Sequence, residues 1–72
     1  MVDENNIDDV FTYHAPEADQ PEKYDALRSA AQTFALAILR NTPACADQQA
    51  AIRKVREAVM TANAAIALKG AV

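Results

Sequence analysis

The sequence is poor in the residues that usually cross-link or fill a small domain. Its 72 residues include no Trp, two Phe, two Tyr, one Cys, one His and one Gly. A lone cysteine excludes an internal disulfide, and one Cys with one His excludes a four-ligand structural zinc site. Among the devices that stabilise very small chains, association with further copies remains. We therefore expect a homo-oligomer.

Several classes of partner and activity are disfavoured in the same way. The net charge of −3 argues against a long nucleic acid, because such binding needs many phosphate-neutralising cations. No run of eighteen apolar residues exists, so we expect no membrane partner. The phosphate-binding, zinc-hydrolase and nucleophile-elbow motifs are missing. We expect no metal, no cofactor and no enzyme activity.

The start of the chain differs in composition from the rest. Residues 1–9 are acidic and polar, which predicts a flexible tail and is the opposite of an export signal. Together with a free cysteine, this indicates a reducing cytoplasm. Residues 10–20 contain Pro16 and four consecutive residues of mixed chemistry, and we expect a loop there.

Two amphipathic helices are predicted downstream, over 21–41 and 46–69. Apolar residues recur at spacings of three and four, at Tyr24, Leu27, Ala31, Phe34 and Ile38, and again at Ile52, Val55, Val59, Ala62 and Ile66. The first helix starts at Pro21 and stops before Pro43. The second begins after the poor cap Cys45 and ends at Lys69 and Gly70.

The predicted fold is therefore all-α, an antiparallel two-helix hairpin in a single domain over 1–72. The connection is so short that the helices must be neighbours. Seventeen of the residues are alanine, which buries little area. Each helix also carries apolar residues beyond its seam, which two helices alone cannot cover.

The candidate binding residues lie outside the seams. Tyr13 and His14 are adjacent in the loop and form an aromatic platform beside an imidazole. Alternatively, Phe11 and Tyr13 fold back and staple the helix ends. Arg28 either offers its guanidinium to a phosphate or pairs with Asp25 three residues upstream.

The other polar residues are interpreted as structural or solvent-facing rather than as binding residues. The remaining cations belong to solvated helix faces, and Cys45 has no base nearby in the sequence that would activate it. Asn63, amid apolar residues, either bonds a neighbour's backbone across an interface or faces water.

The pieces TYH-x-P, Q-x-x-x-Y-x-x-x-R and EAVM-x-ANAAIA occur in this order between Phe11 and Leu68. In these pieces the chain resembles a small family of phage proteins, the sponges that oppose cyclic-oligonucleotide-based antiphage signalling (CBASS). Their hairpin is shared with a related phage sponge of cyclic ADP-ribose-type signals. The resemblance implies a compact homo-hexamer in the host cell cytoplasm that sequesters cyclic dinucleotides, and cyclic trinucleotides at separate sites, without cleaving them.

The same resemblance implies roles for individual residues. Tyr13 matches the aromatic residue that stacks on bases, and Arg28 matches a basic residue that meets the phosphates. His14 and Lys69 are lesser candidates for the trinucleotide site. The family pattern often has serine where Cys45 stands, which affects capping only. It often has Trp where Thr61 stands, which affects either an interface or the range of ligands.

A second function from another class stays open. A small helical adaptor would dock a protein partner on its apolar faces and would bind no cyclic nucleotide. Its binding energy would lie in residues that flank the seams, such as Leu36 and Met60.

Overall fold

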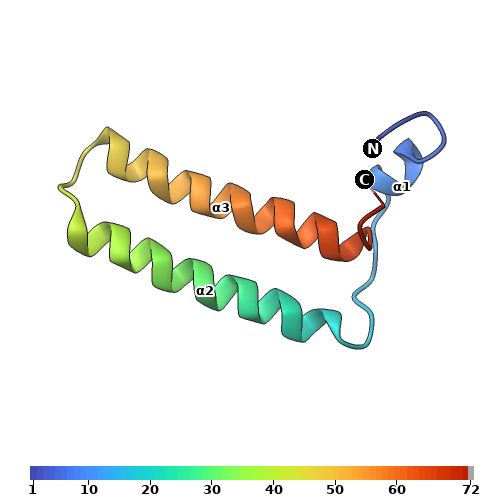
Figure 1. The fold of residues 1–72 in the computed structure, drawn as a ribbon, viewed down its shortest axis with the longest axis horizontal. Coiled ribbons are helices and arrows are strands. Elements are labelled where there is room, and N and C mark those ends of the chain that lie inside the picture. The colour runs from blue at the N-terminus through green and yellow to red at the C-terminus, as the bar shows by residue number, and fades with distance from the viewer. Residues whose placement is uncertain (72) are drawn as a thin grey trace.

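The computed structural model describes residues 1–71 and is helical throughout its regular structure (Figure 1). A short helix α1 (Ile7–Phe11) precedes two long helices, α2 (Gln20–Asn41) and α3 (Ala46–Ala67). The long helices are antiparallel neighbours, and the segment after α1 passes the end of α3 before α2 begins. The predicted all-α hairpin is confirmed.

Local chemistry explains where α2 begins and ends. Asp19 is its N-cap residue, yet the carboxylate makes no capping bond and instead pairs with Lys23 at 2.8 Å. At the other end, the side chains of Asn41 and Thr42 donate to the carbonyls of Ala37 and Ile38. Pro43 then prevents a further turn.

The second long helix, α3, begins at a poor N-cap residue and ends in a left-handed turn. Cys45 is the N-cap of α3 with extended backbone and no side-chain capping bond, as expected for a poor cap. After Ala67, the N–H groups of Lys69 and Gly70 donate to the Ile66 and Ala65 carbonyls, both at 3.1 Å. These two bonds form a Schellman motif.

The observed bounds differ from the predicted ones at both ends of the hairpin. Ile7–Phe11 is helical, although we expected a tail over 1–9 and a loop over 10–20. The first long helix begins at Gln20 rather than Pro21. Proline is tolerated in the first turn, because the backbone N–H that it lacks would have no partner within the helix. The second ends at Ala67 rather than 69, because Lys69 has left the helical region with φ 55°.

Two buried glutamines close the hairpin at its opposite ends. Gln20, 7% exposed, donates through Nε2 to the Ile66 carbonyl at 3.1 Å and so joins the start of α2 to the end of α3. Gln48, 5% exposed, donates to the Thr42 carbonyl at 3.2 Å across the turn. Each first-turn glutamine thus binds backbone of the other arm, which fixes the register of the two helices.

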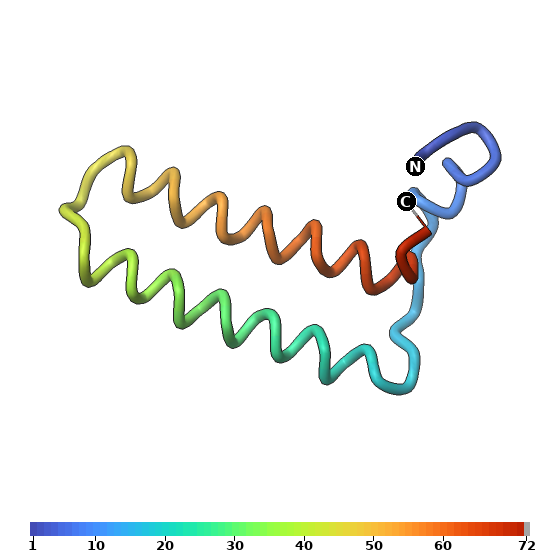
Figure 2. The backbone as a smooth tube through the Cα atoms, viewed as in Figure 1, coloured from blue at the N-terminus to red at the C-terminus, as the bar shows by residue number. Residues whose placement is uncertain are grey.

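The hairpin has almost no interior. Among the described residues no hydrophobic side chain is fully buried, and the chain exposes 5682 Å². A compact monomer of 7.8 kDa would expose roughly 4,400 Å². The radius of gyration is 15.1 Å, against about 11 Å for a compact domain of this length. The tube in Figure 2 shows why: two thin rods lie side by side.

The seam positions are half-buried with one exception. Phe34 was expected in the seam between the helices, but it is 59% exposed. Its ring lines an open apolar groove along one face of the hairpin, so that part of it stays uncovered. Within residues 1–71, no helix combines the length and apolar character needed to cross a bilayer.

Candidate functional site

A half-polar cavity of about 560 Å³ lies at the end of the hairpin where the N-terminal segment meets the end of α3. We call it the end cavity; it is lined by Asp9, Tyr13, His14, Ala15, Pro16, Glu17, Gln20, Ala67, Leu68, Lys69 and Ala71. Three of the four sequence-predicted site residues, Tyr13, His14 and Lys69, are therefore brought together.

The phenol ring of Tyr13 stands free at this cavity. Tyr13 is 83% exposed, and Phe11 at the end of α1 is 82% exposed. Rings that packed back onto the helix ends would be largely covered, so the stapling interpretation is wrong. An uncovered ring that shares a cavity with an ammonium group can stack on a planar anionic ligand.

His14 helps to shape the segment that carries Tyr13. Its Nε2 lies 2.6 Å from the Asp9 carbonyl oxygen. A carbonyl only accepts hydrogen bonds, so Nε2 carries a proton in this contact. The half-buried imidazole therefore joins α1 to the segment that lines the cavity.

Lys69 enters the cavity from the opposite wall, out of a left-handed turn. Its φ of 55° is the only positive value at a non-glycine residue in the described chain. Its Nζ lies 2.9 Å from Oε1 of Glu17, and both side chains are mostly exposed. This ion pair connects the segment before α2 to the turn after α3.

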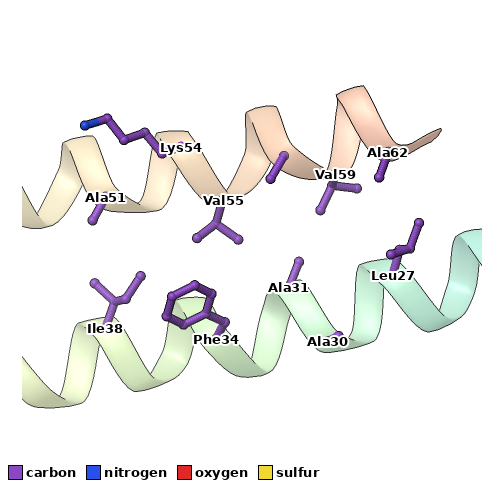
Figure 3. A pocket seen from close by; sticks show the side chains of 11 residues that line it. Leu27, Ala30, Ala31, Phe34, Ile38, Ala51, Lys54, Val55, Val59 and Ala62 are labelled. Carbon is purple, nitrogen blue, oxygen red and sulfur yellow. The ribbon is translucent and has the colours of Figure 1, made fainter. Parts of the chain in front are cut away.

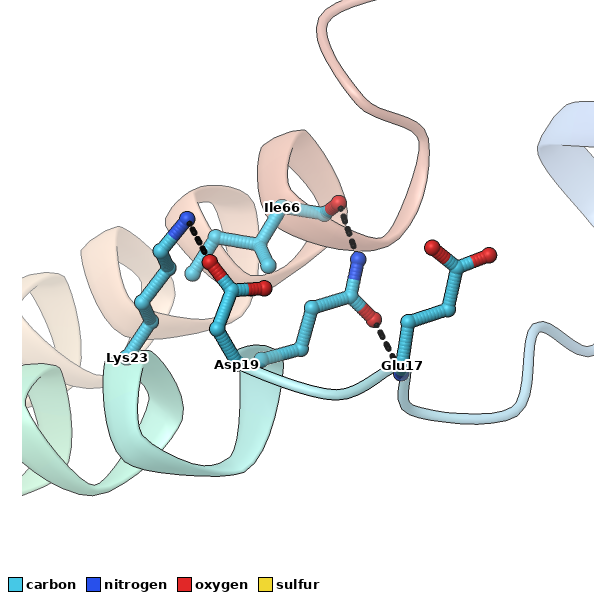
Figure 4. Close-up of polar contacts among 5 residues, drawn as sticks. Glu17, Asp19, Lys23 and Ile66 are labelled. Carbon is cyan, nitrogen blue, oxygen red and sulfur yellow. Dashed lines mark hydrogen bonds and ion pairs between the residues drawn. The ribbon is translucent and has the colours of Figure 1, made fainter.

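The floor of the cavity is held by the buried Gln20 amide (Figure 4). Its Oε1 accepts the Glu17 N–H at 2.9 Å, while its Nε2 donates to Ile66. Beside it, the hydrogen bond and charge of Lys23 lower the pKa of the Asp19 carboxyl, and Asp19 raises the pKa of Lys23 in return.

Arg28 does not reach the end cavity of its own chain. It lies eight residues beyond Gln20 on α2, about 12 Å along the helix. Its Nη1 is 3.1 Å from Asp25 Oδ1, so the predicted surface pair is confirmed. Arg28 borders a separate groove of about 340 Å³ with Gln32, Arg56 and Met60.

A third hollow is almost wholly apolar (Figure 3). Leu27, Phe34 and Ile38 project from α2, and Val55 and Val59 project from α3, toward the space between the helices. This groove of about 570 Å³ runs along one face of the hairpin. It is the apolar surface that two helices cannot cover for one another.

Two polar residues that shape the end cavity, Glu17 and Gln20, were not expected from the sequence. Neither was singled out as a site residue, because their partners Ile66 and Lys69 lie at the other end of the chain. Asn63 was expected either to bond a neighbour's backbone or to face water. The second alternative is wrong, since its Oδ1 is buried without a hydrogen-bond partner.

The described residues contain no group of three or more His, Cys, Asp or Glu side chains that could hold a metal ion. The family model "Acb2/Tad1, hairpin domain" matches residues 3–67 of the chain. No match was found among curated proteins or among solved structures. Because the family match extends from before α1 to the last residue of α3, this protein belongs to the Acb2/Tad1 hairpin-domain family of anti-CBASS sponges.

Proposed function

We propose that this protein sequesters cyclic di- and trinucleotide second messengers of bacterial antiphage signalling, without cleaving them, in the cytoplasm of a phage-infected host. The match of residues 3–67 to the sponge family carries the proposal. It is supported by an end cavity that combines an uncovered aromatic ring, an imidazole and an ammonium group.

The assigned ligand-binding residues are Tyr13, Arg28, His14 and Lys69. Tyr13 stacks on a base, and Arg28 binds phosphate through its planar guanidinium. Lys69 and His14 act on the polar edge of the ligand at the end cavity. An overall acidic chain can bind an anion in this way because only the local field matters.

Tyr13 and Arg28 line separate hollows of one chain, which supports a site shared between copies. A cyclic dinucleotide has two bases and two phosphates related by an approximate two-fold axis, and an isologous interface has the same symmetry. One Tyr13 and one Arg28 from each of two chains would provide two stacking faces and two phosphate contacts. The hexamer that the family implies offers such interfaces.

The magnitudes are sufficient for sequestration. Stacking contributes about 1–3 kcal/mol per base, and a charge-assisted hydrogen bond contributes about 1.5–3 kcal/mol. Two of each, less the cost of association, reach nanomolar affinity, which is about −12 kcal/mol. A sponge that acts by mass action needs this tight binding and no catalyst.

Native mass spectrometry tests the proposal directly. The purified protein is measured alone and with an equimolar mixture of cyclic di- and trinucleotides. A closed oligomer that gains intact cyclic-nucleotide masses supports the proposal, and the added masses name the ligand class. An oligomer that gains no mass contradicts it and favours the adaptor alternative.

The absence of cleavage needs its own measurement. Ligand is incubated with excess protein, the protein is denatured, and the ligand is recovered by chromatography. Full recovery of the cyclic form is expected from a sponge. A linear product would instead indicate a phosphodiesterase.

A further inference from the structure

The cations at the open end of the hairpin are each neutralised by an acid from the segment that leads into α2. Lys69 pairs with Glu17 at 2.9 Å, and Lys23 pairs with Asp19 at 2.8 Å. The two pairs differ in kind. Lys23 and Asp19 are four residues apart on one helix end, whereas Lys69 and Glu17 join opposite walls of the end cavity.

The position of Lys69 is unfavourable for any side chain. It occupies the left-handed residue of a Schellman motif, where glycine is the usual choice, and Gly70 follows one residue later. A Cβ there strains the backbone. Strain of this kind, on a residue that lines a cavity, points to a role for the side chain rather than for the fold.

We propose that Glu17 is an internal counter-ion that occupies the Lys69 ammonium until a ligand phosphate displaces it. Glu17 thereby sets the affinity of the end cavity for phosphate-bearing ligands and rejects anions too weak to compete. This inference rests on the proposed function, because it names Glu17 as a specificity-determining residue of the same site.

The geometry allows this exchange without a change of fold. The Glu17 backbone is held separately, since its N–H donates to Gln20 Oε1 at 2.9 Å. The carboxylate can therefore swing away while the main chain stays in place. Both side chains of the pair are more than half exposed, so a ligand reaches the ammonium from solvent.

The test is calorimetric titration with cyclic tri-AMP and cyclic di-GMP of four forms: the unaltered protein, Glu17→Gln, Lys69→Met and the double variant. Glu22→Gln is the matched control, because it removes the same charge from the first turn of α2, where Glu22 forms no ion pair among the described residues. Circular dichroism confirms that each variant keeps its helices.

Glu17→Gln is expected to bind the ligand of the end cavity about two- to five-fold more tightly than Glu22→Gln, the range that an exposed ion pair can supply. In the Lys69→Met background the same change is expected to have no effect, because the ammonium is missing. An increase in affinity on Glu17→Gln that depends on the presence of Lys69 is the result expected of a counter-ion.

Each other outcome has a separate meaning. If the unaltered protein binds neither nucleotide, the proposed function fails and this inference fails with it. If it binds and Glu17→Gln equals Glu22→Gln, only the inference is overturned. Weaker binding by Glu17→Gln also overturns it, since Glu17 would then position the cavity wall rather than compete.

Discussion

At the scale of single residues, the two exposed aromatic residues Phe11 and Tyr13 have different roles. Phe11 and Tyr13 are both more than four-fifths exposed, but only Tyr13 lines the end cavity. Exposed aromatic rings contribute little to the stability of a chain that they do not pack against. Replacing each ring in turn therefore tests its contact with the ligand without changing the stability of the fold.

Tyr13→Ala is expected to weaken cyclic-nucleotide binding by about 1–3 kcal/mol per stacked base, which is about five- to 150-fold in Kd. Phe11→Ala is the control and is expected to bind within two-fold of the unaltered protein. Calorimetry measures both affinities, and thermal unfolding checks that stability is unchanged. Equal losses in the two variants would contradict the assignment of Tyr13.

Lys69→Gly is expected to raise stability and to lower affinity for the ligand of the end cavity. Glycine adopts the left-handed conformation without a Cβ clash, which stabilises the fold by about 0.5–1 kcal/mol. The exposed ion pair to Glu17 offsets part of that gain. Urea unfolding and calorimetry on the same sample measure the two effects, and a loss of stability would show that Lys69 supports the fold.

At the scale of elements, the contacts at the two ends of the hairpin fix the register of α2 and α3 more strictly than the apolar contacts between them. The seam is built from apolar side chains without directional contacts, which tolerate several relative positions of two helices. The Gln20 and Gln48 amides bind defined carbonyls on the opposite arm and allow one register. The end cavity exists only in that register, because its two walls come from opposite ends of the chain.

Gln20→Ala is expected to destabilise the protein by about 1–3 kcal/mol. The change leaves the Glu17 N–H without its partner and removes one of the two hydrogen bonds that the Ile66 carbonyl accepts, the other coming from the Lys69 N–H. Gln32→Ala, at an exposed position in α2, is the control for the intrinsic preference of alanine for helix. Urea unfolding at one fixed protein concentration gives both values, and equal stabilities would show that Gln20 does not hold the hairpin closed.

At the scale of the whole molecule, one chain is an incomplete fold. Its exposed area and radius of gyration exceed those of a compact domain, and the groove that includes Phe34 is almost entirely apolar. A large apolar surface favours association when, as over residues 1–71, no hydrophobic side chain is fully buried within the chain. This surface supports the homo-oligomer that the sequence predicts on packing grounds.

The midpoint of thermal unfolding is expected to rise with protein concentration, because association couples folding to mass action. Circular dichroism over a hundred-fold range of concentration measures this rise. Phe34→Gln should lower both the midpoint and the oligomer mass, whereas Phe11→Gln should change neither. A midpoint that is independent of concentration would contradict association.

The sequence by itself determined the features that depend on residues close together along the chain. Apolar spacing predicts both long helices, Pro43 marks the end of the first, and the pairing of Arg28 with Asp25 follows from their three-residue separation. The five-residue helix α1 was missed because so short a segment carries too few positions for a periodic signal.

Only the tertiary structure decided which distant residues meet. Glu17 meets Lys69, and Gln20 meets Ile66, because the antiparallel arrangement returns the end of α3 to the start of α2. Helical periodicity shows which face of a helix is apolar, but it does not specify the register between two helices. That register places Tyr13 and Lys69 on one cavity and leaves Arg28 about two turns away.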